Sequence, residues 1–129
     1  MSGPAQTFER RRLNEEIELS FITAAKAACN VEMKLFSGKG SISGDLQDFY
    51  NQFSYLYRLT GHLKEMETSD PKENLAVLKS NISGWMKLKI GNTQPNQIES
   101  MARAGLKMFD DYYHALMHHG VIALPTRKG

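Results

Sequence analysis

Three short breaks divide this chain into four stretches of about 20 to 30 residues, and this division constrains the fold more than any other feature. The breaks lie at Ser37–Ser43, Glu67–Asp70 and Gly91–Gln94. Within each stretch, apolar residues recur every three or four positions, a spacing that places them on one face of an α-helix. Short loops make consecutive helices antiparallel neighbours. The sequence therefore predicts an all-α, antiparallel four-helix bundle with up-down-up-down connections. The predicted helices lie near residues 7–36, 44–66, 71–90 and 95–119.

Local signals support these boundaries. Ser43 is placed to cap the second helix. The strongest start signal is Asp70-Pro71-Lys72-Glu73, in which Asp70 caps, Pro71 occupies the first helical position and Glu73 follows three residues after the cap. Gly120 is placed to end the fourth helix, followed by Val121 as the hydrophobic contact. Gly105 lies on the predicted buried face, where its missing side chain is expected either to admit Trp85 or to allow a close helix crossing.

Length and composition indicate one globular domain over residues 1–129, with 1–6 and 125–129 flexible. The chain is 41% hydrophobic and 23% charged, which is typical of a soluble folded protein. No apolar run approaches the roughly 18 residues of a membrane span, so no membrane association is expected. The single cysteine, Cys29, cannot form an internal disulfide, which favours the cytoplasm. Its alanine neighbours predict a buried, structural thiol.

Histidines near the ends of the second and fourth helices raise the possibility of a metal site. Asp111, His114 and His118 share one face of a helix, and an up-down bundle brings the end that carries His62 to the same end of the molecule. However, the Glu-x-x-His pairs of di-iron bundles are absent. A solvated helix end, favoured by the helix dipole when a histidine is protonated, is the simpler interpretation. We therefore expect no metal and no cofactor.

Basic residues near both termini suggest a second function. The candidates for phosphate contacts are Arg10, Arg11, Arg12, Arg127 and Lys128. The predicted topology brings these residues to one end of the bundle, where they could bind nucleic acid. The net charge of only +2 and the pI of about 8.7 fall short of a dedicated nucleic-acid binder.

No arrangement of residues indicates catalysis, so we expect no enzyme. Instead, the first helix carries a second apolar row, and the tail after the fourth helix is also apolar. Such surplus apolar surface is typical of an interface. The interface candidates are Met33, Phe36, Tyr55, Val121, Ile122 and Leu124. The sequence thus favours a non-catalytic interaction or assembly subunit, adaptor-like or chaperone-like, that associates with itself or another protein. The alternatives are a nucleic-acid-binding subunit and, less favoured, a metal-binding bundle.

Overall fold

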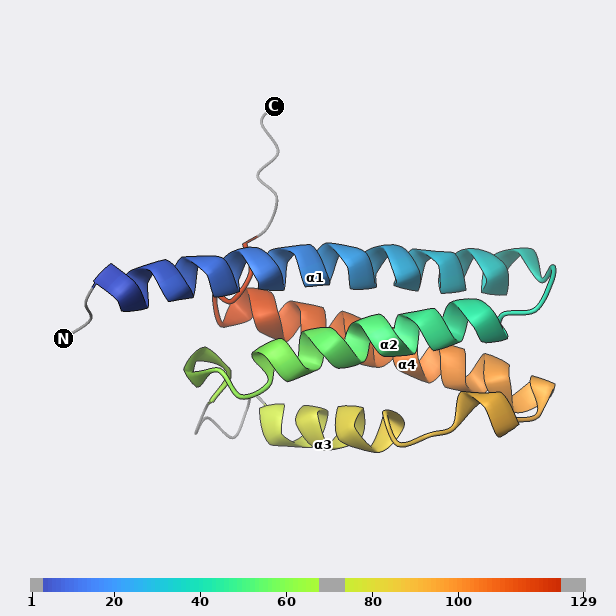
Figure 1. Ribbon diagram of the computed structural model, residues 1–129. Coiled ribbons are helices and arrows are strands. Elements are labelled where there is room, and N and C mark those ends of the chain that lie inside the picture. The colour runs from blue at the N-terminus through green and yellow to red at the C-terminus, as the bar shows by residue number, and fades with distance from the viewer. Residues whose placement is uncertain (1–3, 68–73, 124–129) are drawn as a thin grey trace, which may run out of the picture.

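The chain folds into four α-helices that lie side by side. The computed structural model describes residues 4–67 and 74–123, and Figure 1 shows consecutive helices running in opposite directions. The all-α four-helix architecture predicted from the sequence is confirmed. Helix α1 packs mainly on α2, whereas α4 contacts all three other helices. The helices are α1 (Pro4–Ser37), α2 (Ser43–Thr60), α3 (Leu75–Trp85) and α4 (Pro95–His118), with short 3₁₀ turns η1 (Lys64–Met66) and η2 (Ile90–Asn92).

The first two helices differ from prediction at their ends. Helix α1 begins at Pro4, so residues 4–6, which we expected to be flexible, belong to it. Ser43 is the first residue of α2 and does not cap it, because Ile42 occupies the cap position. Helix α2 ends at Thr60 and not near residue 66, because Leu63 adopts an extended backbone before η1.

Helix α3 is shorter than the predicted span of 71–90. Asn74 precedes it with a φ of 53°, in the left-handed region that asparagine tolerates better than most residues. The predicted start signal at residues 70–73 lies outside the described residues. At the other end, Lys89 is extended and leads into η2. The prediction was too long there because apolar residues continue after Trp85 with helical spacing but without a helical backbone.

An aromatic cluster fills the core between α2, α3 and α4. The ring centroids of Phe53 and Phe109 lie 5.3 Å apart in an edge-on arrangement, and Trp85 lies 5.8 Å from Phe53. A Cβ atom at Gly105 would lie 2.9 Å from Cε2 of Trp85, so only glycine admits the indole. The Nε1 atom of Trp85 donates a hydrogen bond to the Met101 carbonyl at 3.3 Å. The predicted pairing of Gly105 with Trp85 is confirmed.

A buried pair of hydroxyls joins α2 to α4. Thr60 Oγ1 donates to the Leu56 carbonyl at 2.8 Å and lies 2.5 Å from the Tyr112 hydroxyl. Because a threonine hydroxyl has one hydrogen, Tyr112 donates the second bond. Burial raises the pKa of Tyr112. Thr60 opposes this rise, because its hydroxyl can turn to donate a hydrogen bond to the ionised oxygen, and the charge of Tyr57 adds to the rise.

Small side chains dominate the inner face of α1, which packs on α2. Its buried residues are Ile17, Ser20, Ala24, Ala27, Ala28 and Val31. Alanines at such a contact allow two helix backbones to approach closely. The Ser20 hydroxyl has no hydrogen-bond partner among the residues that the structure describes. Larger groups from α1 also reach the core: Ile17 and Val31 are fully buried, and the Phe21 ring stacks on Phe109 of α4 at 5.9 Å between centroids.

Candidate protein-interaction surface

The outer face of α1 carries large apolar side chains that no part of the described chain covers. Leu19 is 65% exposed, Met33 67% and Phe36 95%. Ile22 is 42% exposed, and Lys26 and Cys29 are also exposed. These residues follow one another at spacings of 3, 4, 3, 4 and 3, which place them on one face of the helix. We call this set the outer stripe: Leu19, Ile22, Lys26, Cys29, Met33 and Phe36.

The prediction that Cys29 is buried was wrong. Its neighbour Ala28 faces α2 and is buried, but the next residue along a helix points about 100° away, toward solvent. The alanine-rich context was therefore a poor guide to the orientation of the thiol. By contrast, the predicted interface residues Met33 and Phe36 do lie on an uncovered surface.

Shallow hollows flank the C-terminal part of the outer stripe on both sides. One, of about 550 Å³, lies between α1 and α4 and is lined by Glu32, Leu35, Phe36, Arg103 and Leu106. The other, of about 360 Å³, lies by the α1–α2 turn and is lined by Asn30, Met33, Lys34, Ser37, Lys39 and Asp45. In the second hollow, Lys34 Nζ is 3.4 Å from an Asp45 carboxylate oxygen. A side chain inserted beside Met33 or Phe36 would thus meet both apolar and charged groups.

Tyr55, another predicted interface residue, is 41% exposed on α2. Its hydroxyl donates a hydrogen bond to the Glu16 carboxylate on α1. This bond raises the pKa of Tyr55, with smaller contributions from desolvation and from the negative charge of Glu16. The Tyr55 hydroxyl therefore links α2 to α1 and is already engaged in a hydrogen bond within the bundle.

The tail after α4 does not form the expected surface. Val121 is buried, so its assignment to an interface was wrong. The amide of Gly120 bonds to the Met117 carbonyl and that of Val121 to the Leu116 carbonyl, at 3.1 and 2.9 Å. With Gly120 at a φ of 73°, this predicted helix end folds Val121 back onto the core. Ile122 is half-buried against the same core, and Leu124 lies outside the described residues.

The candidate metal ligands occupy a groove between α3 and α4. Asp111, His114 and His118 line this hollow of about 480 Å³ together with Val77. Asp111 pairs with Lys107 at 3.3 Å, and His114 lies 3.6 Å from Asp110. His62 is exposed and does not line the groove. Within residues 4–67 and 74–123, no group of three His, Cys, Asp or Glu side chains could hold a metal ion. The metal hypothesis stays a prediction from the sequence.

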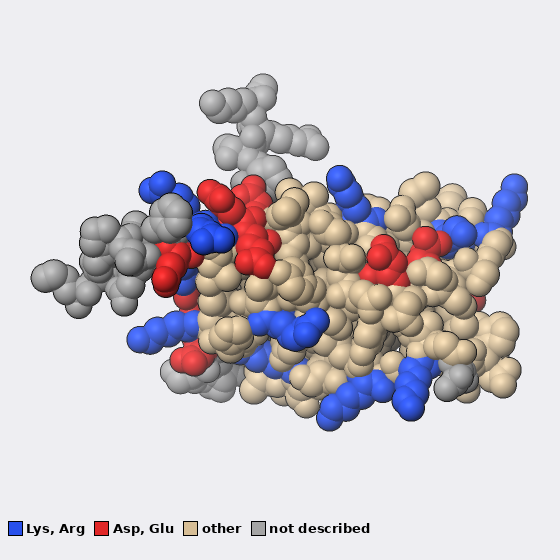
Figure 2. Space-filling view, viewed as in Figure 1, with Lys and Arg blue, Asp and Glu red and all other residues tan. Residues whose placement is uncertain are grey.

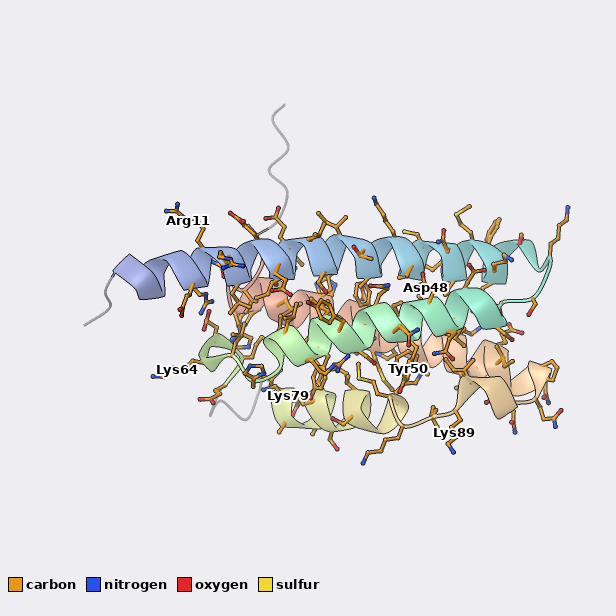
Figure 3. The ribbon with its side chains drawn as sticks, in the orientation of Figure 1. Arg11, Asp48, Tyr50, Lys64, Lys79 and Lys89 are labelled. Carbon is orange, nitrogen blue, oxygen red and sulfur yellow. The ribbon has the colours of Figure 1, made fainter. Side chains whose placement is uncertain are left out.

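The basic residues of the N-terminus do not form one surface. Arg10 pairs with Glu65 of η1 and donates a second bond to Asn14 at 2.9 Å. Arg11 extends away from the bundle (Figure 3), and Arg12 is exposed. Arg127 and Lys128 lie outside the described residues.

A different basic surface, not proposed as a site from the sequence, lies on α2, on α3 and on the segments that follow each of them. Figure 2 shows lysine and arginine side chains across this side of the molecule, and Figure 3 locates Lys64, Lys79 and Lys89 on it. The signal was present in the sequence, because residues 49–64 and 74–98 contain no Asp or Glu. We call these residues the basic face: Arg58, Lys64, Lys79, Lys87 and Lys89.

Comparisons with known proteins supply no family for this chain, which matches no protein-family model, no curated protein and no solved structure at a significant level. In the part of the chain that the structure describes, no helix is both long enough and apolar enough to cross a lipid bilayer.

Proposed function

We propose that this protein is a non-catalytic interaction or assembly subunit that binds a protein partner through the outer stripe of α1. The observation that carries the proposal is the exposure of Leu19, Met33 and Phe36 in a single row. Scattered exposed apolar residues are normal on a soluble protein, but a continuous apolar surface marks an interaction site. A cytoplasmic location suits the proposal, because Cys29 lies in the stripe as a free thiol.

The placement of side chains on α1 gives further support. A helix that served only the bundle would direct its larger apolar residues inward. Helix α1 does bury Ile17 and Val31, but it directs four further large apolar residues outward: Leu19, Ile22, Met33 and Phe36. Burying these side chains against a partner would remove their apolar area from water, at roughly 25 cal/mol per Å².

Affinity capture with matched variants tests this proposal. Phe36→Glu introduces a charge at the most exposed position of the outer stripe. Val77→Glu introduces the same charge at an apolar residue of α3 that is 58% exposed. We expect Phe36→Glu to abolish both self-association and capture of a defined partner, and Val77→Glu to retain them. Equal behaviour of the two variants, or a wild-type protein that binds neither itself nor any partner, would contradict the proposal.

A nucleic-acid-binding subunit is the second candidate function, and the basic face favours it. Arg58 of α2, Lys64 of η1, Lys79 of α3, and Lys87 and Lys89 after α3 belong to two segments, residues 49–64 and 74–98, that lack carboxylates. Tyr50, Ser54 and Arg58 line a shallow hollow with Met86 there, so polar and aromatic groups accompany the charge. Such a surface suits contact with phosphates.

The test is a mobility shift with single-stranded nucleic acid at low and moderate salt. We expect binding to weaken steeply as salt rises, because phosphate contacts release counterions. The double variant Lys87→Glu/Lys89→Glu should lose binding, whereas Arg11→Glu, on α1, should retain it. Absence of any shift at low salt would remove this candidate.

A further inference from the structure

The spacing and charges of the outer stripe suggest what covers it. Its six residues occupy the two apolar positions of successive heptads, the arrangement by which two helices pack along a coiled-coil contact. The stripe runs over residues 19–36, about 27 Å of helix. On its N-terminal side the same positions are occupied by Arg12 and Glu15, so the apolar contact ends there. The occupant must therefore present an apolar helical row of similar length.

We propose that the occupant is a second copy of this chain, with the two α1 helices packed antiparallel about a two-fold axis. This inference rests on the proposed function and names its partner. The stripe is symmetrical about its midpoint between Ala27 and Ala28. In an antiparallel pair centred there, each residue of the stripe lies opposite a different stripe residue of the second copy. The resulting pairs are Leu19 with Phe36, Ile22 with Met33, and Lys26 with Cys29.

The charged residues distinguish this arrangement from a parallel one. In a parallel pair, Lys26 would lie against Lys26 of the second copy, and Arg12 and Glu15 would likewise meet their own equivalents. Like charges in such positions oppose association. The antiparallel pair instead separates the two Lys26 side chains and brings each within one helical turn of Glu32 of the second copy.

Charges at the ends of the stripe are complementary in the same way. Figure 2 shows acidic side chains gathered over the N-terminal half of α1, where Glu15, Glu16 and Glu18 lie in sequence. Lys39 follows the other end of α1 and lines the hollow beside Met33. Antiparallel pairing places Glu18 of each copy close to Lys39 of the other. The surface is thus complementary to itself, as a two-fold interface requires.

The geometry of the bundle permits this contact. The outer stripe lies on the side of α1 opposite the residues that pack on α2, so two bundles can meet through α1 without overlapping. A contact made by one helix from each copy is small beside the roughly 800 Å² per partner of a standard interface. We therefore expect a dimer that dissociates on dilution.

Sedimentation velocity over a range of concentrations measures the association. We expect the mass of the wild-type protein to rise from monomer to dimer with concentration, Phe36→Glu to remain monomeric, and Val77→Glu to match the wild type. Circular dichroism of each variant checks that the helices are intact. The substitutions are at exposed positions, so folding should be unaffected.

Disulfide formation determines the orientation. In a Cys29→Ala background, Ile22→Cys and Met33→Cys are made as separate single-cysteine proteins. Antiparallel pairing predicts a disulfide-linked dimer when the two proteins are mixed and oxidised. It predicts little disulfide-linked dimer when either protein is oxidised alone. Cross-linking of each protein alone, at least as efficient as in the mixture, would indicate parallel packing and overturn the inference.

Charge exchange tests the register. Lys26→Glu and Glu32→Lys should each weaken the dimer a few-fold, and the double variant should restore it, because in this register each Lys26 lies within one helical turn of Glu32 of the second copy. A wild-type protein that stays monomeric at every concentration would overturn the inference. If the protein is monomeric, the proposed function still holds when Phe36→Glu loses binding to a different partner protein and Val77→Glu keeps it. If no partner protein requires Phe36, the proposed function fails together with this inference.

Discussion

Helices α1 and α4 differ in how they distribute their apolar residues. Helix α4 buries Phe109, Tyr112 and Leu116 and, along its whole length, leaves no large apolar side chain exposed. Helix α1 also buries apolar residues, Ile17 and Val31 among them, but exposes Leu19, Met33 and Phe36. The contrast shows that the apolar residues of α4 serve the bundle, whereas α1 carries a second set of large apolar side chains that stays exposed.

The largest expected effect compares two phenylalanines. Phe53 is fully buried in the aromatic cluster, and Phe36 is 95% exposed. We expect Phe53→Ala to lower the free energy of unfolding by about 3–5 kcal/mol, because it leaves a cavity. Phe36→Ala should change it by less than about 0.5 kcal/mol. Urea denaturation of dilute, monomeric protein measures both, and a comparable loss from Phe36→Ala would abolish the distinction between the two regions.

Two glycines provide a sharper comparison. A methyl group at Gly105 would collide with Trp85, whereas one at Gly84 would meet no atom within 4 Å. We expect Gly105→Ala to destabilise the fold by about 1–3 kcal/mol through overpacking. Gly84→Ala should stabilise it by about 1 kcal/mol, because alanine favours the helix. Thermal denaturation reports both changes, and stabilisation by Gly105→Ala would mean that the indole does not lie where described.

The buried hydroxyl pair predicts a dependence on pH. Burial raises the pKa of Tyr112 above its ordinary value of 10.0, so the fold favours the protonated, neutral phenol. This contribution to stability is complete below pH 10 and is lost as the pH rises through the folded-state pKa. We expect Tyr112→Phe to cost about 1 kcal/mol at neutral pH and to reduce the loss of stability above pH 10. An unchanged alkaline profile in that variant would argue against a buried Tyr112; Tyr113→Phe, on the same helix, is the control.

The smallest effect concerns the inner face of α1. The Ser20 hydroxyl is buried without a partner among the described residues, and an unsatisfied buried polar group is costly. Ser20→Ala should therefore stabilise the protein by about 1 kcal/mol while leaving its helix content unchanged. Chemical denaturation checks this prediction, and a decrease in stability would reveal a contact that the hydroxyl makes.

Much of the fold could be predicted because helical periodicity is a local property of the sequence. The four helices followed from spacing alone, and the position of Gly105 on the buried face made contact with Trp85 one of two expectations. The end of α2 and the length of α3 did not, since apolar residues near Leu63 and Leu88 keep a helical spacing while the backbone turns. Helix ends depend on tertiary contacts that compete with local preference.

The candidate surface was only partly predictable for a related reason. Met33 and Phe36 belonged to a second apolar row that one bundle contact could not bury, so their exposure was foreseen. Cys29 and Val121 were misplaced because composition does not reveal which way a side chain points or whether a tail folds back. The basic face was not assembled from the sequence because its charges come from two segments, residues 58–64 and 79–89, that become neighbours only in the folded chain.

The placement of Trp85 gives the molecule a built-in optical reporter. It is the only tryptophan in the chain, and it lies within 6 Å of the rings of Phe49, Tyr50 and Phe53, measured between centroids. Its fluorescence therefore follows the docking of α3 against α2 and α4, while far-ultraviolet circular dichroism is weighted toward the 34-residue α1. Coincident melting curves from the two signals would identify a single cooperative unit, and an earlier dichroic change would reveal α1 detaching first.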